Sequence, residues 1–301
     1  MSSIAMLIVN PSSGKEKGKK YLKFAEETLL KRFDRVDVRL TEKGGDATIF
    51  ARESAKKHYD ACIAMGGDGT LNETINGLAN QAHRPTFGLI PLGTVNDLAR
   101  ALKIPKQPKQ AIKMLAHADE SDLDIGKING HYFMNVVAIG SIPEAVDRVS
   151  VKQKTQLGAM AYFIEAAKAY ARKEKYHFHI ESAEQSYAVE SELIIVSLTN
   201  SVGGFEKLAP EAEVNDGLFH VFVVSDSTLI ERTKLLPQLF SGQVSQNEGL
   251  LAFQTNKVAI ASDDAILKSN VDGDPDDHLP LHLEVLPSHL KVFVPEKTSN
   301  K

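Results

Sequence analysis

Residues 66–78 read GGDGTLNETINGL, and this stretch sets the fold of the first part of the chain. It follows an apolar segment, DACIAM (60–65), and passes directly into a segment with the pattern of a helix. Glycines let a backbone approach an anion closely and adopt positive φ. A helix N-terminus presents free N–H groups and a partial positive charge. The stretch therefore predicts a strand, a phosphate-binding turn and a helix.

Two further loops, NPSSG (10–14) and PLGT (91–94), also follow an apolar segment and precede a helical one. Taken alone, NPSSG is better explained as a plain turn. In a parallel sheet, however, the loops at the carboxyl ends of the strands gather at one edge. Three such loops side by side predict a polyphosphate site, in which Asp68 would repel phosphate unless a cation lay between them. Neither a G-x-G-x-x-G fingerprint nor a complete P-loop is present.

The first part of the chain alternates strands and helices, which predicts a parallel sheet with helices on both faces. We expect strands at 4–10, 36–41, 60–65 and 86–92, and helices at 21–33, 46–59 (capped by Asp46), 71–80, 94–102 and 109–117.

From residue 123 the pattern changes to short alternating segments, which favours a β-sandwich or barrel. Asn129-Gly130 predicts a hairpin turn. Helices are expected only at 155–173 and 228–242, and separate strands at 279–286 and 289–295 close the chain. We therefore expect two domains, residues 1–122 and 123–301, with the last residues returning to the first domain.

Composition excludes several classes of protein. The chain has 301 residues, a net charge of −4 and one cysteine, so it has no basic field for nucleic acid and no disulfide or cysteine-rich zinc site. The N-terminus reads as a strand and not as a secretory leader. The longest run without Asp, Glu, Lys or Arg, residues 128–143, is shorter than the ~20 residues of a spanning helix. We expect a cytoplasmic protein.

The pairing of GGDGTLNETINGL with PLGTVNDLAR (91–100) resembles the catalytic domain of the diacylglycerol kinase family, above all its soluble bacterial members, which are related to sphingosine kinases and NAD kinases. The resemblance extends from residue 10 to about residue 272. It implies an N-terminal Rossmann-like α/β domain, a C-terminal β-sandwich and a nucleotide and lipid cleft between them. It also implies ATP- and Mg²⁺-dependent phosphorylation of a lipid hydroxyl. Diacylglycerol is the first expectation, with phosphatidic acid as its product, and phosphatidylglycerol, a long-chain base or a polyprenol are the alternatives.

The resemblance assigns roles to individual residues. Asp68 would hold Mg²⁺ through water, and Asp274, where the family usually has glutamate, would be the general base. Contacts with ATP are expected from Asn10, Pro11, Ser12, Ser13, Gly14, Thr41, Gly66, Gly67, Asp68, Gly69, Thr70, Leu71, Asn72 and Thr94. A charge network would comprise Lys15, Asp97, Arg100 and Asp124. A metal site in the second domain would comprise Glu213, Asp216 and Leu218, with a backbone contact as the alternative at position 213.

Without the resemblance, the same residues have simpler explanations. Asp97 and Arg100 have the spacing of a surface ion pair on a helix. Asp216-Gly217 is equally typical of a hairpin turn, and residues 272–277 of a solvated acidic loop. Aspartate is also one methylene shorter than the family's glutamate, and a 1 Å misplacement can cost on the order of 10²-fold in rate. Asp272 is the alternative base.

Two other functions stay open. An NAD kinase would carry its second Asn-Glu motif well downstream, whereas here Asn72-Glu73 directly follows GGDGTL. A nucleotide- or lipid-binding regulator without activity is the other alternative. The expected partner is a lipid substrate at the inner membrane face. Amphipathic segments at 155–175 and 229–240 are candidates for membrane contact, but core packing is the better explanation of both. The oligomeric state stays open, with pairing of two chains through a sandwich edge strand as one alternative.

Overall fold

The chain divides into two compact units. The computed structural model describes residues 2–140, 175–203, 209–225, 250–264 and 267–296. The first unit comprises Met1–Asp124 and Pro287–Lys301, and the second comprises Ile125–Leu286. The boundary thus falls after residue 124, where we expected it after residue 122. The helices expected at 155–173 and 228–242 lie outside the described residues, as do the proposed membrane-contacting segments for the most part.

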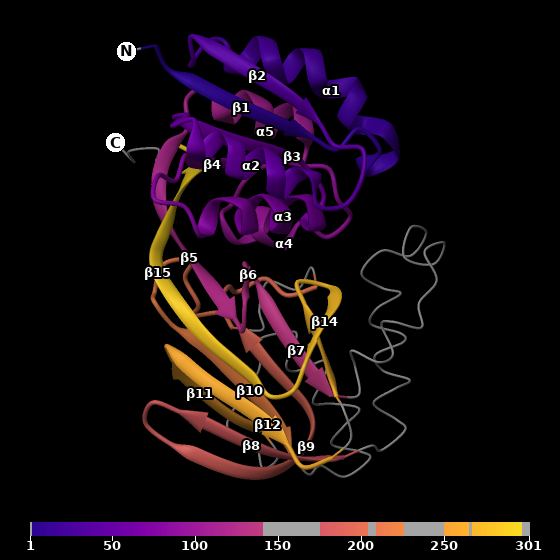
Figure 1. The fold of residues 1–301 in the computed structure, drawn as a ribbon, viewed down its shortest axis with the longest axis vertical. Coiled ribbons are helices and arrows are strands. Elements are labelled where there is room, and N and C mark those ends of the chain that lie inside the picture. Colours follow the sequence, from indigo (N-terminus) through magenta and orange to yellow (C-terminus); the bar gives the residue numbers. More distant parts are fainter. Residues whose placement is uncertain (1, 141–174, 204–208, 226–249, 265–266, 297–301) are drawn as a thin grey trace. The chain divides into compact units, whose positions relative to one another are not determined.

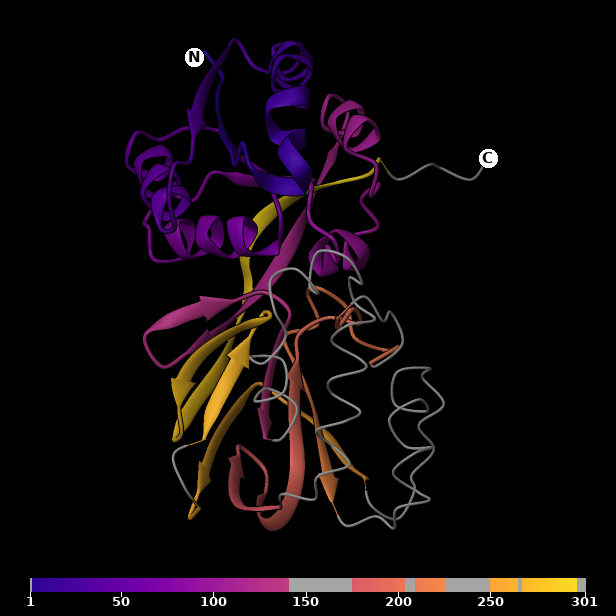
Figure 2. The same cartoon turned by 90° about the vertical axis from the view of Figure 1, so that its right-hand side faces the viewer.

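The first unit is a parallel sheet covered on both faces. Its strand order is β15-β4-β3-β1-β2. Helices α1 and α5 lie on one face and α2 and α3 on the other, as Figure 2 shows with the sheet seen near its edge. The predicted α/β fold is confirmed. The strands are β1 (Ile4–Val9), β2 (Arg35–Leu40), β3 (Ala61–Gly66), β4 (Thr86–Pro91) and the end of β15 (Leu281–Val294); the helices are α1 (Ser13–Leu29), α2 (Asp46–Lys56), α3 (Asp68–Ala79), α4 (Asp97–Ala101) and α5 (Pro108–Leu115).

The last strand of this sheet comes from the far end of the sequence. Val292 pairs with Phe87 of β4, and Phe293 packs edge-on against Phe33, with ring centroids 6.4 Å apart. We expected two strands between residues 279 and 295, but the structure has one continuous strand, β15. Ser288 has a φ of 47° within it, so the strand bends locally without ending.

The start of α2 differs from the expectation. Asp46 is the first residue of the helix and not its cap, because Gly45 precedes it with a φ of 86°. The Asp46 carboxylate accepts the N–H groups of Glu42 and Lys43. The carboxylate at the helix N-terminus is that of Glu73 on α3, whose Oε2 accepts the Ala47 N–H at 3.3 Å. A cap supplied by a neighbouring helix leaves no local sequence signal.

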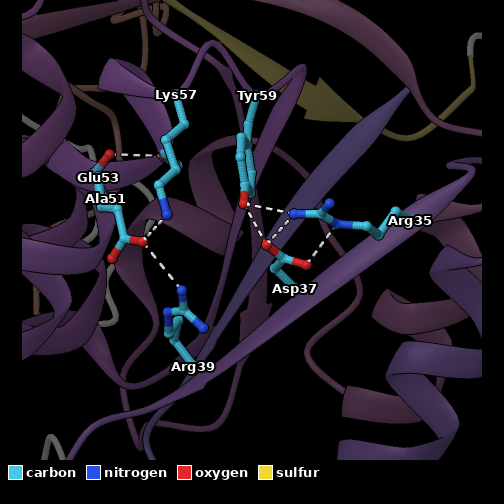
Figure 3. A network of polar contacts seen from close by, with 8 residues as sticks. Arg35, Asp37, Arg39, Ala51, Glu53, Lys57 and Tyr59 are labelled. Carbon is cyan, nitrogen blue, oxygen red and sulfur yellow. Dashed lines mark hydrogen bonds and ion pairs between the residues drawn. The ribbon is translucent and has the colours of Figure 1, made fainter. Parts of the chain in front are cut away.

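Strand β2 is the edge of the sheet, and its charged side chains form ion pairs with each other and with α2 (Figure 3). Arg35 binds Asp37 at 2.7 Å, and the Tyr59 hydroxyl donates to the same carboxylate. Arg39 binds Glu53 of α2 at 3.1 Å. Half-exposed pairs of this kind contribute about 0–1 kcal/mol each. Their larger effect is that a charged edge strand discourages pairing with another chain.

The described residues of the second unit lie mainly in strands, as predicted (Figure 1). Its antiparallel order is β14-β13-β7-β9-β8-β12-β15, with β10 between β9 and β11. Asn129 has a φ of 45° in the turn from β5 to β6, which confirms the predicted hairpin. The strands are β5 (Asp119–Ile128), β6 (His131–Phe133), β7 (Val136–Gly140), β8 (Tyr176–Ser182), β9 (Ser186–Ser197), β10 (Phe219–Ser225), β11 (Leu250–Thr255), β12 (Lys257–Ser262), β13 (Lys268–Val271) and β14 (Asp274–His278).

One exposed histidine joins β8 to the chain that follows β12. The Nδ1 atom of His177 lies 3.2 Å from an Asp264 carboxylate oxygen, and its Nε2 atom lies 3.0 Å from Glu190. The hydrogen bond to Asp264, followed by the charge of the same carboxylate, raises the pKa of His177 above its ordinary value of 6.5. The folded state therefore binds this proton more tightly than the unfolded state does.

We predict that this histidine makes stability depend on pH. Below pH 6.5 His177 is protonated in both states, so its contribution is fully present, and it is lost as the pH rises through the folded-state pKa. Urea unfolding at pH 6 and pH 9 should show wild type more stable than His177→Gln at pH 6, with the difference vanishing at pH 9. A difference that is equal at both values would contradict the prediction.

Candidate nucleotide site and acidic turns

Three loops meet at the carboxyl edge of the first unit's sheet. The Asn10 N–H donates to the Met65 carbonyl at 3.0 Å, and its side-chain amide donates to the Thr70 hydroxyl at 3.2 Å. These two bonds join the loop after β1 to the end of β3 and to the first turn of α3. A Cβ atom added to Gly14 would lie 2.6 Å from the Leu92 carbonyl oxygen, so the first loop also touches the loop after β4.

The loops after β3 and β4 pack backbone against backbone. A Cβ atom on Gly93 would lie 3.0 Å from the Gly67 Cα. The Asn96 N–H donates to the Asp68 carboxylate at 3.0 Å, and the Asn96 side-chain amide donates to the Gly93 carbonyl at 2.9 Å. Asn96 has a φ of 56°, a conformation that asparagine tolerates better than most residues. It thus holds Asp68 beside both glycines.

This arrangement suits an anion. Helix α3 begins at Asp68, and its N-cap residue, Gly67, has no side chain that could cap it, so the start of the helix can offer peptide N–H groups to an anion. The Thr70 hydroxyl, one of the expected ATP contacts, accepts the Asn10 side-chain amide. Thr94 is exposed on the loop after β4.

The other predicted ATP contacts differ in their burial and in their hydrogen-bond partners. Ser12 donates through its N–H and its hydroxyl to the Asn10 side-chain oxygen. The Thr41 N–H donates to the Val9 carbonyl, which places the end of β2 beside the end of β1. Leu71 is fully buried in the core, so it can offer a ligand only its backbone. Asn72 is half-buried and bonds Asn76 within α3. Pro11 lies in the loop after β1, Ser13 is the first residue of α1 and Gly66 is the last residue of β3.

The charge network stays a prediction, but the surface-pair explanation of Asp97 is wrong. Asp97 is 8% exposed, and Asp124 is 3% exposed. Arg100 donates from Nε to the Val95 carbonyl at 2.9 Å. The Asp124 carboxylate accepts the Ser288 N–H at 2.6 Å, which fixes the bend in β15. Lys15 lies on α1, and its side chain is outside the described part of the structure.

In the second unit, Asp216 closes a tight turn before β10. Its Oδ2 accepts the Glu213 N–H at 3.0 Å and lies 3.0 Å from His220 Nε2, and its Oδ1 accepts the Leu218 N–H at 2.9 Å. The structure therefore has a turn at Asp216 but not the hairpin turn that we considered, because β9 ends at Ser197 and no strand of the described residues leads directly into this turn. The same bonds draw together the three residues of the expected metal site.

The structure distinguishes the two candidate bases. The Asp272 carboxylate accepts the N–H groups of residues 134, 135 and 136 at 2.8–3.0 Å, so it fastens the turn after β13 to the start of β7. Asp272 and Gly273 both have positive φ. Asp274 follows as the first residue of β14 and is exposed. Asp272 is thus occupied in building the turn that presents Asp274.

The acidic residues fit a hard cation that keeps several water ligands better than a cation whose ligands all come from protein side chains. Among the residues that the structure describes, no three His, Cys, Asp or Glu side chains converge to hold a metal. Mg²⁺ commonly binds proteins through one or two carboxylates and keeps several waters. A single carboxylate, Asp68 or Asp216, with backbone oxygens and water matches that preference.

Sequence reasoning missed Asn96 and His220. Asn96 lies between the predicted residues Thr94 and Asp97, and an asparagine just before a helix was the available signal for a left-handed position. His220 shows no spacing signal, because its partner Asp216 is reached through a turn and a strand end. Within the described residues, no helix is long and apolar enough to cross a membrane.

Comparison with known proteins gives matches along the whole chain. Residues 4–128 match the family described as diacylglycerol kinase catalytic domain, and residues 135–294 match the YegS C-terminal NAD kinase beta sandwich-like domain. A diacylglycerol kinase of Staphylococcus aureus (strain MRSA252) is 36% identical over 301 residues, covering 100% of this chain and 95% of its own. One from Staphylococcus epidermidis (strain ATCC 12228) is 35% identical with the same coverage. The crystal structure of a diacylglycerol kinase from Bacillus anthracis str. Sterne shares the fold, with a TM-score of 0.79 and 24% identity over 98% of this chain and 97% of that one.

We predict that Gly93→Ala damages the loop surface. The new methyl group would lie 2.7 Å from the Asn96 side-chain oxygen and 3.0 Å from the Gly67 Cα, and overpacking of this kind costs about 1–3 kcal/mol. Urea unfolding should show that loss, and binding of a non-hydrolysable ATP analogue should weaken. Gly130→Ala is the control, because no atom lies within 4 Å of its added methyl group. If Gly93→Ala and Gly130→Ala are equally stable, the loops can accommodate the added methyl group without a measurable cost in stability, which would contradict the prediction.

Proposed function

Because the chain belongs to the diacylglycerol kinase catalytic-domain family, we propose that it transfers the γ-phosphoryl group of ATP to diacylglycerol and forms phosphatidic acid. At the coarser level, it is a lipid kinase, a phosphotransferase with a hydroxyl group as acceptor. The choice of ATP, of Mg²⁺ and of this lipid is the part that we infer.

The observation that carries the proposal is the contact of the three loops in the first unit. Phosphoryl transfer depends mostly on positioning and charge neutralisation. The contact of Gly14 with Leu92, the contact of Gly67 with Gly93 and the uncapped start of α3 together form a backbone surface suited to phosphate oxygens. Asp68 lies at this surface, held by the Asn96 N–H.

A magnesium ion, when bound, would neutralise phosphate charge and so let a carboxylate lie beside the phosphates. Asp68 would hold it through water in the first unit. In the second unit Asp216, with backbone oxygens of residues 213 and 218, would hold a second ion that orders the turn before β10. Asp68 and Asp216 are both fixed by backbone N–H donors, so neither needs to reorganise on binding.

Asp274 is proposed as the general base that receives the proton of the lipid hydroxyl. Its neighbour Asp272 already accepts three backbone N–H groups, and moving a proton to it would weaken all three bonds. Asp274 is exposed at the start of β14, and the family resemblance assigns it the place of the catalytic glutamate. The reaction would take place at the inner membrane face, because the acceptor is a membrane lipid. Pairing of two chains and the cleft between the domains stay predictions.

The proposal is tested by incubating the protein with labelled ATP and a panel of acceptors in mixed micelles. We expect phosphatidic acid from diacylglycerol, only with Mg²⁺ present, and no product from NAD⁺.

Asp68→Asn keeps an acceptor oxygen for the Asn96 N–H but removes the charge. It should therefore fold like wild type and lose at least about 10²-fold in kcat, the size typical of losing one electrostatic contact in an active site. Wild-type turnover in Asp68→Asn, or product from NAD⁺ alone, would refute the assignment.

Substitutions of Asp272 and of Asp274 should affect different properties, one the stability of the protein and the other its turnover. A positioned base contributes about 10²–10⁴-fold, so Asp274→Asn should lower kcat by that factor and leave ATP KM and thermal stability unchanged. Asp272→Asn should instead lower the melting temperature, because its amide nitrogen cannot accept the N–H groups that the carboxylate accepts. Nearly full activity in Asp274→Asn would exclude it as the base.

A further inference from the structure

His220 is a buried polar side chain beside the Asp216 turn. Its side chain is 7% exposed, and its Nε2 atom lies 3.0 Å from Asp216 Oδ2. Its other ring nitrogen, Nδ1, lies 3.4 Å from the side-chain amide of Gln254, which is its cross-strand partner on β11. When the Gln254 amide donates to Nδ1, the ring proton is on Nε2 and points at Asp216.

Counting acceptor positions shows what this bond does to the carboxylate. An ionised carboxylate has about four lone-pair positions, two on each oxygen. In Asp216, Oδ2 receives the Glu213 N–H and His220, and Oδ1 receives the Leu218 N–H. Both positions on Oδ2 are therefore taken, and the remaining capacity of Asp216 is on Oδ1.

We propose that His220 is a positioning residue that limits Asp216 to one cation-binding oxygen and thereby selects Mg²⁺ over Ca²⁺ in this turn. The inference rests on the metal site in the proposed function. Mg²⁺ requires near-octahedral geometry and keeps several waters, whereas Ca²⁺ takes six to eight oxygen ligands and readily accepts a carboxylate in bidentate fashion. A carboxylate with one oxygen blocked by a buried donor disfavours the bidentate mode.

The hydrogen bond from His220 should also hold the carboxylate in place. Hydrogen bonds to ligating carboxylates orient them, and their loss typically costs 10–100-fold in metal affinity or activity. The nearby Ser197 hydroxyl, on the strand opposite His220, does not compete for the ring, because it donates to the Thr199 carbonyl. Asp216 and Gln254 are thus the partners that the described residues provide for His220.

The test is a titration of the full-length protein with MgCl2 and with CaCl2, without nucleotide, followed by calorimetry and by thermal shift. Asp216→Ala identifies the part of the response that belongs to this turn. His220→Leu removes the donor, and His220→Gln keeps one at the place of Nε2. We expect His220→Leu to bind Mg²⁺ at least about 10-fold more weakly and to shift the Mg²⁺/Ca²⁺ affinity ratio toward Ca²⁺, with most of both effects reversed in His220→Gln.

The outcomes separate the inference from the proposed function. If Asp216→Ala abolishes the cation response and His220→Leu leaves both affinities unchanged, the role of His220 is refuted and the metal site stands. An unchanged cation response in Asp216→Ala refutes the metal site itself, whatever the kinase assay shows. If His220→Leu does not fold, Gln254→Leu replaces it, because it removes the donor to Nδ1 from an exposed strand position. We then expect the same direction of change in the affinity ratio, and an unchanged ratio overturns the inference.

Discussion

Close contact between backbones at the carboxyl ends of β1, β3 and β4 is the constraint on which the first unit depends. At Gly14, Gly18 and Gly93 an added Cβ atom would collide with a carbonyl oxygen, a Cα atom or a side-chain oxygen of a neighbouring segment. Side chains would hold these loops apart and separate the peptide groups that make the surface. The glycines therefore do more than permit sharp turns, because they bring three helix-leading loops within contact of one another.

Carboxylates have a second task in this protein, which is to build turns. Asp46, Asp216 and Asp272 each accept at least two backbone N–H groups from nearby or facing segments. These bonds replace hydrogen bonds that the backbone would otherwise lack at a bend. Residues of the same type thus serve structure at one position and, in the function that we propose, chemistry two residues away, as in the 272–274 turn. A motif alone cannot separate the two uses, but the hydrogen-bond partners can.

Much of the fold could be predicted from the sequence, because the strands and helices are marked by local periodicity. β1 and β3 are apolar throughout, and the Asn129-Gly130 turn has a specific dipeptide signal. The failures involve partners distant in sequence. The Glu73 carboxylate at the start of α2, the single strand β15 and the contact of Asn96 with Asp68 all depend on which segments meet in space. The same holds for His220, which no spacing rule connects to Asp216.

The route of the chain has a consequence for synthesis on the ribosome. The first unit takes the end of β15 from residues 287–301, so β4 lacks its outer neighbour until the whole chain has been made. Phe293, whose ring centroid lies 4.3 Å from the Arg32 guanidinium, is absent from any nascent N-terminal fragment. Domains generally fold as units, N-terminal first, during synthesis. Here the second unit, Ile125–Leu286, emerges complete before the first unit has its last strand. During that time the sheet of the first unit is open at β4, and a chaperone or another incomplete chain could bind this exposed edge.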